Sequence, residues 1–373
     1  MNVTVENYDK RMLIYFCLLT VFGTVMLYSS SWYESFSRSN GQTDTLFLQA
    51  HLKRILIGMF FLFYFLIFDF RKLKTLAPTL IFISIALLII TKGYYLFHGS
   101  NKPARWLSFG FFSFQTSDIA RFSVIIYCSY YLDKIKSGIN SFQNGYLPIS
   151  LIIVLIISLI IGQPDYSTAI MIGLIGFLII FIAGARLIHL ISTLLLAILF
   201  SIPILMLKPY RWARLTSYFS PDDIKNTGYQ AHQSLISLGN GGWLGVGLGN
   251  SIEKNHFLPT PHTDFIFAII GEELGFLFGS IPLITIFIFI FFRGITISKN
   301  CTDPFGILLA VGISTNMILY AFVNIAVVTG LFPVTGLPIP MVSYGGSGLI
   351  INMALFGILL NISQSAKGLY TYN

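Results

Sequence analysis

The sequence contains few charged residues and few cysteines. Only 10% of the 373 residues are Asp, Glu, Lys or Arg, whereas 55% are hydrophobic and the mean hydropathy is +0.77. This composition excludes a water-soluble domain of comparable length, whose surface needs far more charge. The three cysteines, Cys17, Cys128 and Cys301, lie in or beside apolar runs and suggest neither a disulfide framework nor a metal site.

The sequence also lacks the alternation of polar and apolar residues that a transmembrane β-barrel needs. Its apolar residues run continuously, over stretches close to the roughly 20 residues with which a helix crosses a bilayer. Because only helices and closed barrels satisfy their backbone hydrogen bonds in lipid, we expect an all-α polytopic membrane protein. The first apolar run, 12–32, is too long for a signal peptide and lacks a clear cleavage site, so we count it as a span.

Ten transmembrane helices are predicted, with one large extracytoplasmic loop, residues 208–263, between the seventh and the eighth. The predicted spans are 12–32, 54–70, 76–97, 117–132, 147–162, 168–184, 187–207, 264–292, 304–329 and 346–365. No repeat, linker or low-complexity segment divides the chain, so residues 1–373 are expected to form one domain. Lysines and arginines are more frequent in alternate short loops, which predicts that the N- and C-termini are both cytoplasmic. The net charge of +8 suits an anionic lipid surface or an anionic lipid-linked substrate, and nothing indicates nucleic acid.

The stretch between residues 239 and 279 concentrates groups that can do chemistry. A glycine-rich loop there leads to Asp264, at the start of an apolar helix that we predict for 265–292. Either Asp264 or Thr263 could cap this helix, a role worth about 0.3–1 kcal/mol, or Asp264 could be a reactive carboxylate. Glu272 and Glu273 favour the second interpretation, because a carboxylate on a membrane helix is costly and by default marks a functional site.

Small residues recur at helical spacing along the same predicted helix, at Ala268, Gly271, Gly275 and Gly279. Such a seam lets another helix approach closely, so Asp264 should face protein or a wet cleft rather than lipid. His262 could act as a base or a metal ligand. A single His without a second ligand at metal-site spacing is, however, more often a hydrogen-bonded residue at a helix start.

Asp118 and Arg121 lie three residues apart on a predicted helix, so their charges can neutralise each other. Two interpretations stay open. The pair makes both charges tolerable within the membrane, or Arg121, or Arg105 upstream of it, receives a phosphate on its guanidinium group. Asp165, at a predicted outer turn, could cap the next helix or line the same cleft as Asp264.

The segment 330–348 contains three prolines and several glycines and cannot form a regular span. Irregular backbone at membrane depth is tolerated only where it is buried in protein or lines a cavity. We therefore expect this segment, which includes Ser343, to form one wall of the site.

Taken together, these motifs resemble one family. The runs GVGLGNSIEK and FLPTPHTDFIFAIIGEELGF are similar to the signature of the SEDS proteins (FtsW, RodA and SpoVE), as are GLFPVTGLPIPMVSYGGSG, QPDYSTA and ARWLSFGFFSFQTSDIAR. The resemblance extends in order along nearly the whole chain. YQAHQSLISLGNGG and PVTGLPIPMVSYGG are more similar to the FtsW and SpoVE branch than to RodA.

The sequence departs from the family pattern at two places. The family usually has Gln-Pro-Ser-Glu followed by Lys on the fourth span, whereas this chain has Gln115-Thr116-Ser117-Asp118 followed by Arg121. The charge types are kept, so the ion pair is expected to persist. The family also usually has Pro-Glu where this chain has Pro259-Thr260, which puts any role of that acid in doubt.

The resemblance implies a peptidoglycan glycosyltransferase of the bacterial plasma membrane, acting in cell division or cell-shape maintenance. Such an enzyme polymerises the lipid-linked disaccharide-pentapeptide lipid II at the outer face of the membrane. A class B penicillin-binding protein supplies the transpeptidase, and other divisome or elongasome membrane proteins are further expected partners. The essential Asp of the family matches Asp264.

Glycosyl transfer of this kind needs a base for the attacking 4-hydroxyl of the acceptor sugar, and positive charge for the departing polyprenyl pyrophosphate. Asp264 is the predicted base; burial beside Glu272 would strengthen it, whereas a helix N-terminus would weaken it. Arg105, Arg121 and Lys254 are candidates to hold the pyrophosphate. A divalent cation, Mg²⁺ or Mn²⁺, is a further candidate for that work, although no ligand set is visible in the sequence.

We further expect Asp118, His262, Glu272 and Ser343 to contribute to substrate binding. A lipid II flippase without chemistry is the alternative, because a cationic cavity among helices serves either role. The clustering of reactive residues at one membrane face, rather than at the midplane, favours the enzyme. A scaffold that only recruits division partners would leave the intramembrane carboxylates unexplained.

Overall fold

The computed structural model describes residues 8–98, 105–109, 112–206, 212, 216, 218, 228–255 and 257–365. Within these residues a helix occurs at each of the ten predicted ranges. The α-helices are α1 (Lys10–Arg38), α2 (Leu46–Ile67), α3 (Leu73–His98), α4 (Thr116–Ile135), α5 (Leu147–Ile161), α6 (Tyr166–Ile182), α7 (Leu187–Met206), α9 (Tyr229–Gly241), α10 (Ile266–Gly275), α11 (Ile281–Asn300), α12 (Pro304–Val328) and α13 (Ser347–Gln364). Seven helical segments are long and apolar enough to cross a membrane, counted over the described residues. The protein is therefore a multi-pass helical membrane protein.

Short helical segments precede or link several of these helices. They are η2 (Phe70–Lys72), η3 (Lys136–Asn140), η4 (Phe142–Tyr146) and η5 (Phe276–Ser280), of which η4 and η5 are π-helical. The second helix, α2, begins eight residues before the predicted start at residue 54. Its first turns carry His51 and Arg54, and the burial of His51 against protein lets the helix begin in a polar stretch.

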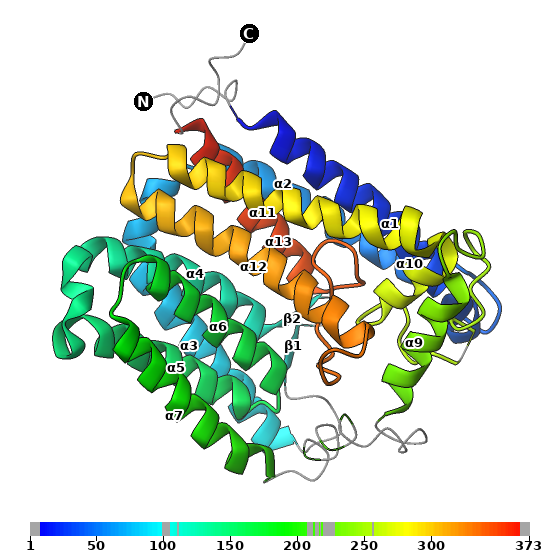
Figure 1. Ribbon diagram of the computed structural model, residues 1–373, viewed down its shortest axis with the longest axis horizontal. Coiled ribbons are helices and arrows are strands. Elements are labelled where there is room, and N and C mark those ends of the chain that lie inside the picture. The colour runs from blue at the N-terminus through cyan, green and yellow to red at the C-terminus, as the bar shows by residue number, and fades with distance from the viewer. Residues whose placement is uncertain are drawn as a thin grey trace.

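The helices form two groups around a central pair (Figure 1). α12 and α13 occupy the middle and are the most buried of the apolar helices. On one side α13 packs on α2 and α12 on α11, with α1 outside them; on the other side α4 and α6 pack on α12, backed by α3 and α5. The core therefore runs along α12 and α13, whereas the outer helices keep apolar side chains exposed for contact with lipid.

The first and last described helices meet at one end of this bundle. The backbone N–H of Asp9, the N-cap of α1, donates to Ser363 Oγ near the end of α13 at 3.0 Å. The Asp9 carboxylate also pairs with Arg293 of α11 at 2.7 Å. At the same end Lys74 of α3 pairs with Asp303, the N-cap of α12, at 2.9 Å. This end carries the cations that the sequence places in cytoplasmic loops; the cytoplasmic location of the termini stays a prediction.

The continuous helix predicted for 265–292 is wrong, because the chain breaks at Gly275. That residue has φ +73°, a conformation that favours glycine, and the helix is divided into α10, η5 and α11. The backbone N–H groups of Phe276 and Leu277 donate instead to the carbonyls of Gly242 and Trp243, at 2.9 and 3.0 Å. The glycine-rich loop thus supplies the hydrogen bonds that the broken helix lacks, as a membrane environment requires.

The predicted cap of this helix is also wrong. α10 begins at Ile266 with Phe265 as its N-cap, and no side chain caps it. The Asp264 carboxylate accepts hydrogen bonds from the hydroxyls of Thr260 and Thr263 instead. Asp264 therefore lies just before the helix and is directed away from its first backbone N–H groups.

Two non-helical segments complete the fold near the start of α4 and α13. β1 (Trp106–Phe109) and β2 (Phe112–Gln115) form an antiparallel hairpin that pairs Trp106 with Gln115, a feature not predicted from the sequence. Residues 330–346 contain neither helix nor strand, as predicted for a Pro- and Gly-rich wall. Asn324 of α12 fixes this wall, because its Nδ2 donates to the carbonyl of Leu337 at 2.6 Å.

Candidate active site

A cleft of about 280 Å³ opens where α4 and α13 begin, at the end of the bundle opposite Asp9 and Ser363. Its walls come from the hairpin, the first turn of α4, the start of α6, the turn before α10 and the irregular segment 330–346. The charged residues that line it are Arg105, Asp118, Arg121, Asp165 and Asp264. Residues more than 150 positions apart in the sequence thus meet in one polar cleft inside an apolar bundle.

Asp264 is held on one wall of the cleft by contacts to its backbone and its carboxylate. Its carbonyl accepts from Asn324 Nδ2 at 2.7 Å, and the same amide group donates to the Leu337 carbonyl in the irregular segment 330–346. Its Oδ1 accepts from Thr260 Oγ1 at 3.1 Å and from Thr263 Oγ1 at 2.5 Å. Oδ2 faces Gly336, at which a Cβ would lie 3.5 Å away. No described basic side chain forms an ion pair with Asp264, so its charge is available to a ligand.

The opposite wall carries two ion pairs. Asp118 pairs with Arg121 at 3.3 Å, which confirms the predicted pair, and Ser347 of α13 donates to the same carboxylate at 2.7 Å. Arg105 pairs with Asp165 at 3.6 Å. These four charges cancel, so Asp264 is the unbalanced charge among the described lining residues.

Asp165 lines this cleft and does not cap α6 with its side chain. Its carboxylate accepts from Gln115 Nε2 at 2.7 Å and from Ser117 Oγ at 3.3 Å. Of the two interpretations that the sequence left open for Asp165, the structure therefore supports the cleft.

The two arginines differ in their exposure to solvent. The Arg121 side chain is 2% exposed and lies 4.6 Å from the centre of the Tyr320 ring, so protein surrounds it. Its Nε makes no hydrogen bond to any described residue. The Arg105 side chain is 42% exposed and contacts the carbonyl of Pro164 at the mouth of the cleft. A buried guanidinium with a spare donor, beside a second one near solvent, is suited to bind an anionic group.

Ser343 and His262 hold the walls. Ser343 lines the cleft, but its hydroxyl accepts the backbone N–H of Ile339 at 2.9 Å and so closes a turn of the wall. His262 lies behind the cleft, where its Nδ1 is 3.2 Å from a Glu34 carboxylate oxygen of α1. The His262 carbonyl accepts from the backbone N–H of Tyr344 at 2.8 Å. His262 thereby links the Asp264 turn to the irregular wall.

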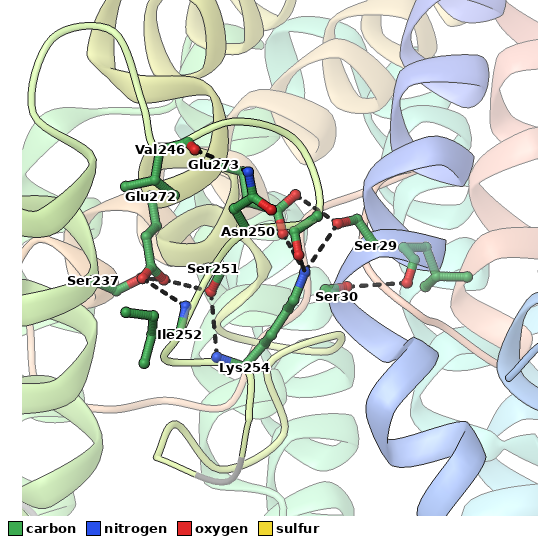
Figure 2. A network of polar contacts seen from close by, with 12 residues as sticks. Ser29, Ser30, Ser237, Val246, Asn250, Ser251, Ile252, Lys254, Glu272 and Glu273 are labelled. Atoms are coloured by element: carbon green, nitrogen blue, oxygen red, sulfur yellow. Dashed lines mark hydrogen bonds and ion pairs between the residues drawn. The ribbon is translucent and has the colours of Figure 1, made fainter. Parts of the chain in front are cut away.

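Glu272 and Lys254 lie outside the cleft, in the network that Figure 2 shows. The Glu272 carboxylate accepts from Ser237 Oγ at 2.9 Å, from Ser251 Oγ at 2.5 Å and from the Ile252 N–H at 3.0 Å. It is thus turned toward the glycine-rich loop, and the expected contact with Asp264 is not formed.

Lys254, like Glu272, is bonded to the glycine-rich loop. Its Nζ pairs with Glu273 at 2.6 Å and donates to the carbonyl of Gly249 at 2.7 Å. Ser29 of α1 donates to the other Glu273 oxygen at 2.6 Å. The structure therefore places Lys254 where it fastens the glycine-rich loop to α10 and α1, and away from the lining of the cleft.

The roles of three site residues were not predicted from the sequence. Asn324 holds both Asp264 and the irregular wall, and Thr260 and Thr263 orient the carboxylate. An Asn within the apolar run 304–328 was the available signal, because polar side chains in a membrane helix need internal partners. Over the described residues no three His, Cys, Asp or Glu side chains converge as metal ligands.

Comparison with known proteins gives a consistent result along the whole chain. The family model of the FtsW, RodA and SpoVE cell cycle proteins matches residues 9–368. A probable peptidoglycan glycosyltransferase FtsW of Geobacter metallireducens is 34% identical over 365 residues, which is 98% of this chain and 96% of that protein. Stage V sporulation protein E of Bacillus subtilis is 35% identical over 361 residues, 96% of this chain and 98% of the relative.

The fold is shared with solved structures. A chain from a structure described as "Structural coordination of polymerization and crosslinking by a peptidoglycan synthase complex" superimposes with a TM-score of 0.75 at 23% identity, over 95% of this chain and 97% of that one. The rod shape determining protein RodA of Thermus thermophilus gives a TM-score of 0.69 at 22% identity, over 96% and 98%. With the family model and the full-length relatives, this establishes that the chain belongs to the FtsW/RodA/SpoVE family of cell cycle proteins.

Proposed function

We propose that this protein is a peptidoglycan glycosyltransferase that polymerises lipid II at the outer face of the bacterial plasma membrane. The observation that carries the proposal is the unbalanced Asp264 carboxylate, which shares one cleft with Arg105 and Arg121. Names of full-length relatives support the reaction, since they are given as probable peptidoglycan glycosyltransferases. Cytoplasmic termini, which follow from the distribution of Lys and Arg, would place the cleft outside.

In the proposed reaction Asp264 accepts the proton of the acceptor 4-hydroxyl as its oxygen bonds to the anomeric carbon of the donor. The bond between that carbon and the polyprenyl pyrophosphate breaks at the same time, and its electron pair leaves with the phosphate oxygen. The Thr260 and Thr263 hydroxyls keep Oδ1 occupied, so Oδ2, which faces Gly336, is the oxygen directed to the acceptor. A positioned base of this kind is worth about 10²–10⁴-fold in rate.

The pyrophosphate is proposed to bind Arg121 and Arg105. Arg121 is held by its ion pair with Asp118, and the Asp118 carboxylate accepts a hydrogen bond from Ser347. The Arg121 guanidinium therefore needs little reorganisation when charge develops on the leaving group. Arg105, on the exposed side, can exchange its contact with Asp165 for a phosphate oxygen. The Arg121–Asp118 contact is thus in place before the substrate binds, and the contacts of both arginines with the phosphate strengthen as it becomes more negative.

A class B penicillin-binding protein is the proposed partner, with lipid II as substrate and other division or elongation proteins in the same assembly. The structural relative in a peptidoglycan synthase complex, whose description joins polymerisation to crosslinking, supports this partner.

The test is polymerisation of purified lipid II by the purified protein, with and without its transpeptidase partner. Asp264→Asn should reduce strand formation by at least about 10²-fold, because the amide cannot accept the proton. The matched control is Asp44→Asn, which removes a carboxylate from the turn after α1, outside the cleft. Near-normal polymerisation by Asp264→Asn would refute the proposal. Lipid II that crosses proteoliposome bilayers without forming strands would support the flippase instead.

A further inference from the structure

The 242–252 loop, between α9 and the turn that contains Glu253 and Lys254, exposes its large apolar side chains, whereas the charged residues next to it are buried. Its large apolar side chains point away from the protein: Trp243 is 70% exposed, Leu244 68%, Leu248 56% and Ile252 62%. A loop in water would direct such side chains inward and its charged neighbours outward. Among the four, Trp243 also contacts the Phe276 ring edge-on, at 5.4 Å between ring centres.

The charged groups next to this loop are, in contrast, all buried. Lys254 is 3% exposed and pairs with Glu273, while Ser251, 2% exposed, donates to Glu272 (Figure 2). Withdrawing Lys254, Glu272 and Glu273 from solvent is costly unless each is paired or hydrogen-bonded, as these three are. Glu253 is also buried, and its Oε2 has no partner among the described residues. Apart from the exposed Asn250, whose amide donates to the Val246 carbonyl, the loop presents hydrocarbon outside and has buried charges behind it, which is the arrangement of a protein surface in lipid.

The backbone of the loop is also satisfied from within. The N–H groups of Val246 and Gly247 donate to the carbonyls of Glu272 and Glu273, both at 2.9 Å. The two chains can approach this closely because Gly245 has no side chain; a Cβ there would lie 2.3 Å from the Glu273 carbonyl oxygen. These bonds remove a large part of the cost of placing an irregular segment at a membrane boundary.

The position of the loop relative to the membrane follows from the α10–η5–α11 segment. From Phe276 to the residue before Arg293 the chain has 17 residues and no charge. At about 1.5 Å per residue this run is roughly 25 Å long, close to the hydrocarbon thickness of a bilayer. Arg293 marks one boundary by its pair with Asp9, so Phe276 and the adjoining Trp243 lie near the other. The exposed side chains of the loop continue the apolar surface formed by Phe276, Leu277 and Phe278.

We propose that the 242–252 loop is inserted into the lipid of the leaflet on the cleft side, with Trp243 at the level of the headgroups and Leu244 toward the acyl chains. Tryptophan is enriched at this depth, because its ring is apolar and its N–H is polar. The ligand of this surface is therefore the bilayer itself. Through Lys254 and Glu272 the inserted loop connects the bilayer to α10, which directly follows Asp264. The proposal does not depend on the reaction that the cleft catalyses.

The test places a fluorophore on the loop and asks which medium reaches it. Cys17→Ser removes the exposed thiol and leaves Cys128 and Cys301, which are buried from a thiol reagent. In this background Leu244→Cys is labelled with bimane, and the full-length protein is reconstituted in phosphatidylethanolamine and phosphatidylglycerol vesicles. Half of the preparations also contain phosphatidylcholine brominated near the headgroup end of its acyl chains, which quenches only fluorophores in contact with it.

Two positions calibrate the measurement. Phe289→Cys reports the lipid-facing side of α11, and Gln42→Cys reports the solvent-exposed turn after α1. We expect the label at position 244 to be quenched by brominated lipid as at position 289, and to be protected from aqueous iodide relative to position 42. Quenching by iodide alone would overturn the proposal. Quenching by neither agent would also overturn it, because protein would then cover the loop.

A label-free measurement guards against a variant that misfolds. The difference in emission between the wild type and Trp243→Phe isolates the native Trp243 signal among the four tryptophans. That signal should be blue-shifted in vesicles and quenched by the same brominated lipid. A Trp243 signal that matches tryptophan in water would contradict the proposal.

Discussion

Replacing Lys254 with Met would leave the Glu273 carboxylate buried without its cation. The two side chains are 1% and 0% exposed, and their Nζ and Oε1 atoms are 2.6 Å apart, so neither charge has access to water. Breaking such a pair from one side costs about 3–5 kcal/mol. We therefore expect a penalty of about 3–5 kcal/mol.

Hydrogen exchange of the loop amides measures this penalty locally. The N–H groups of Val246 and Gly247 are bonded to α10 and exchange only when the loop opens. In Lys254→Met their exchange should accelerate by at least about 10²-fold relative to the wild type at pH 7, because about 3–5 kcal/mol of loop stability is lost. The double variant Lys254→Met with Glu273→Met removes both charges and should return to within about tenfold of the wild type. Exchange in the single variant within threefold of the wild type at pH 7 would refute the reasoning.

Three further predictions concern the backbone and the loop. Gly275→Ala should greatly reduce the yield of monodisperse protein in size-exclusion chromatography, because φ is +73° at this residue and the new Cβ would lie 2.3 Å from the backbone nitrogen of Gly245. The control Gly239→Ala should keep the wild-type yield, because a Cβ at that position has no atom within 4 Å. Asn324→Ala should lower both the melting temperature and the polymerisation rate, because the carbonyls of Asp264 and Leu337 lose their donor, at about 1–3 kcal/mol each. An unchanged polymerisation rate would contradict the role of Asn324 in the site. Burial raises the pKa of the Glu253 carboxyl, and the negative charge of Glu272 raises it further. The protonated group therefore stabilises the folded protein at pH values below its unfolded pKa. This contribution is lost as the pH rises through the raised folded pKa. Glu253→Gln should accordingly melt above the wild type near about pH 8, with a difference that shrinks toward about pH 4; a constant difference would argue against this titration.

The helices could be predicted because their signal is local. A continuous apolar run identifies a membrane helix whatever it packs against, and the part of the chain that the structure describes has a helix at each of the ten predicted ranges. The hairpin β1–β2 could not be read in the same way, since four-residue strands are too short to show a period. The break at Gly275 was equally hidden, because it depends on the carbonyls of Gly242 and Trp243, which satisfy the freed N–H groups.

The cleft was partly predictable for a related reason. Asp264, Asp118 and Arg121 stood out as charged residues in apolar surroundings, and all three line the cleft. Lys254 and Glu272 gave the same signal, but their partners are distant in sequence, such as Ser29, which is 225 positions before Lys254. A single sequence indicates that a charged residue is buried but does not show which residue it contacts. Charged residues that stabilise the fold and charged residues that react therefore cannot be distinguished from the sequence alone.

The contact between Asp9 and Ser363 fixes the parity of the membrane crossings. These residues lie at the start of α1 and near the end of α13, and a 3.0 Å hydrogen bond joins them, so they are on one side of the bilayer. A chain that begins and ends on one side crosses an even number of times. The described residues contain seven long apolar segments, an odd number, so if each of them crosses once, at least one further segment also crosses. The described candidates are Thr116–Ile135, Tyr166–Ile182 and Leu187–Met206. If α4 is such a helix, the Asp118–Arg121 pair is what lets a segment too polar to insert alone pass through the membrane within the bundle.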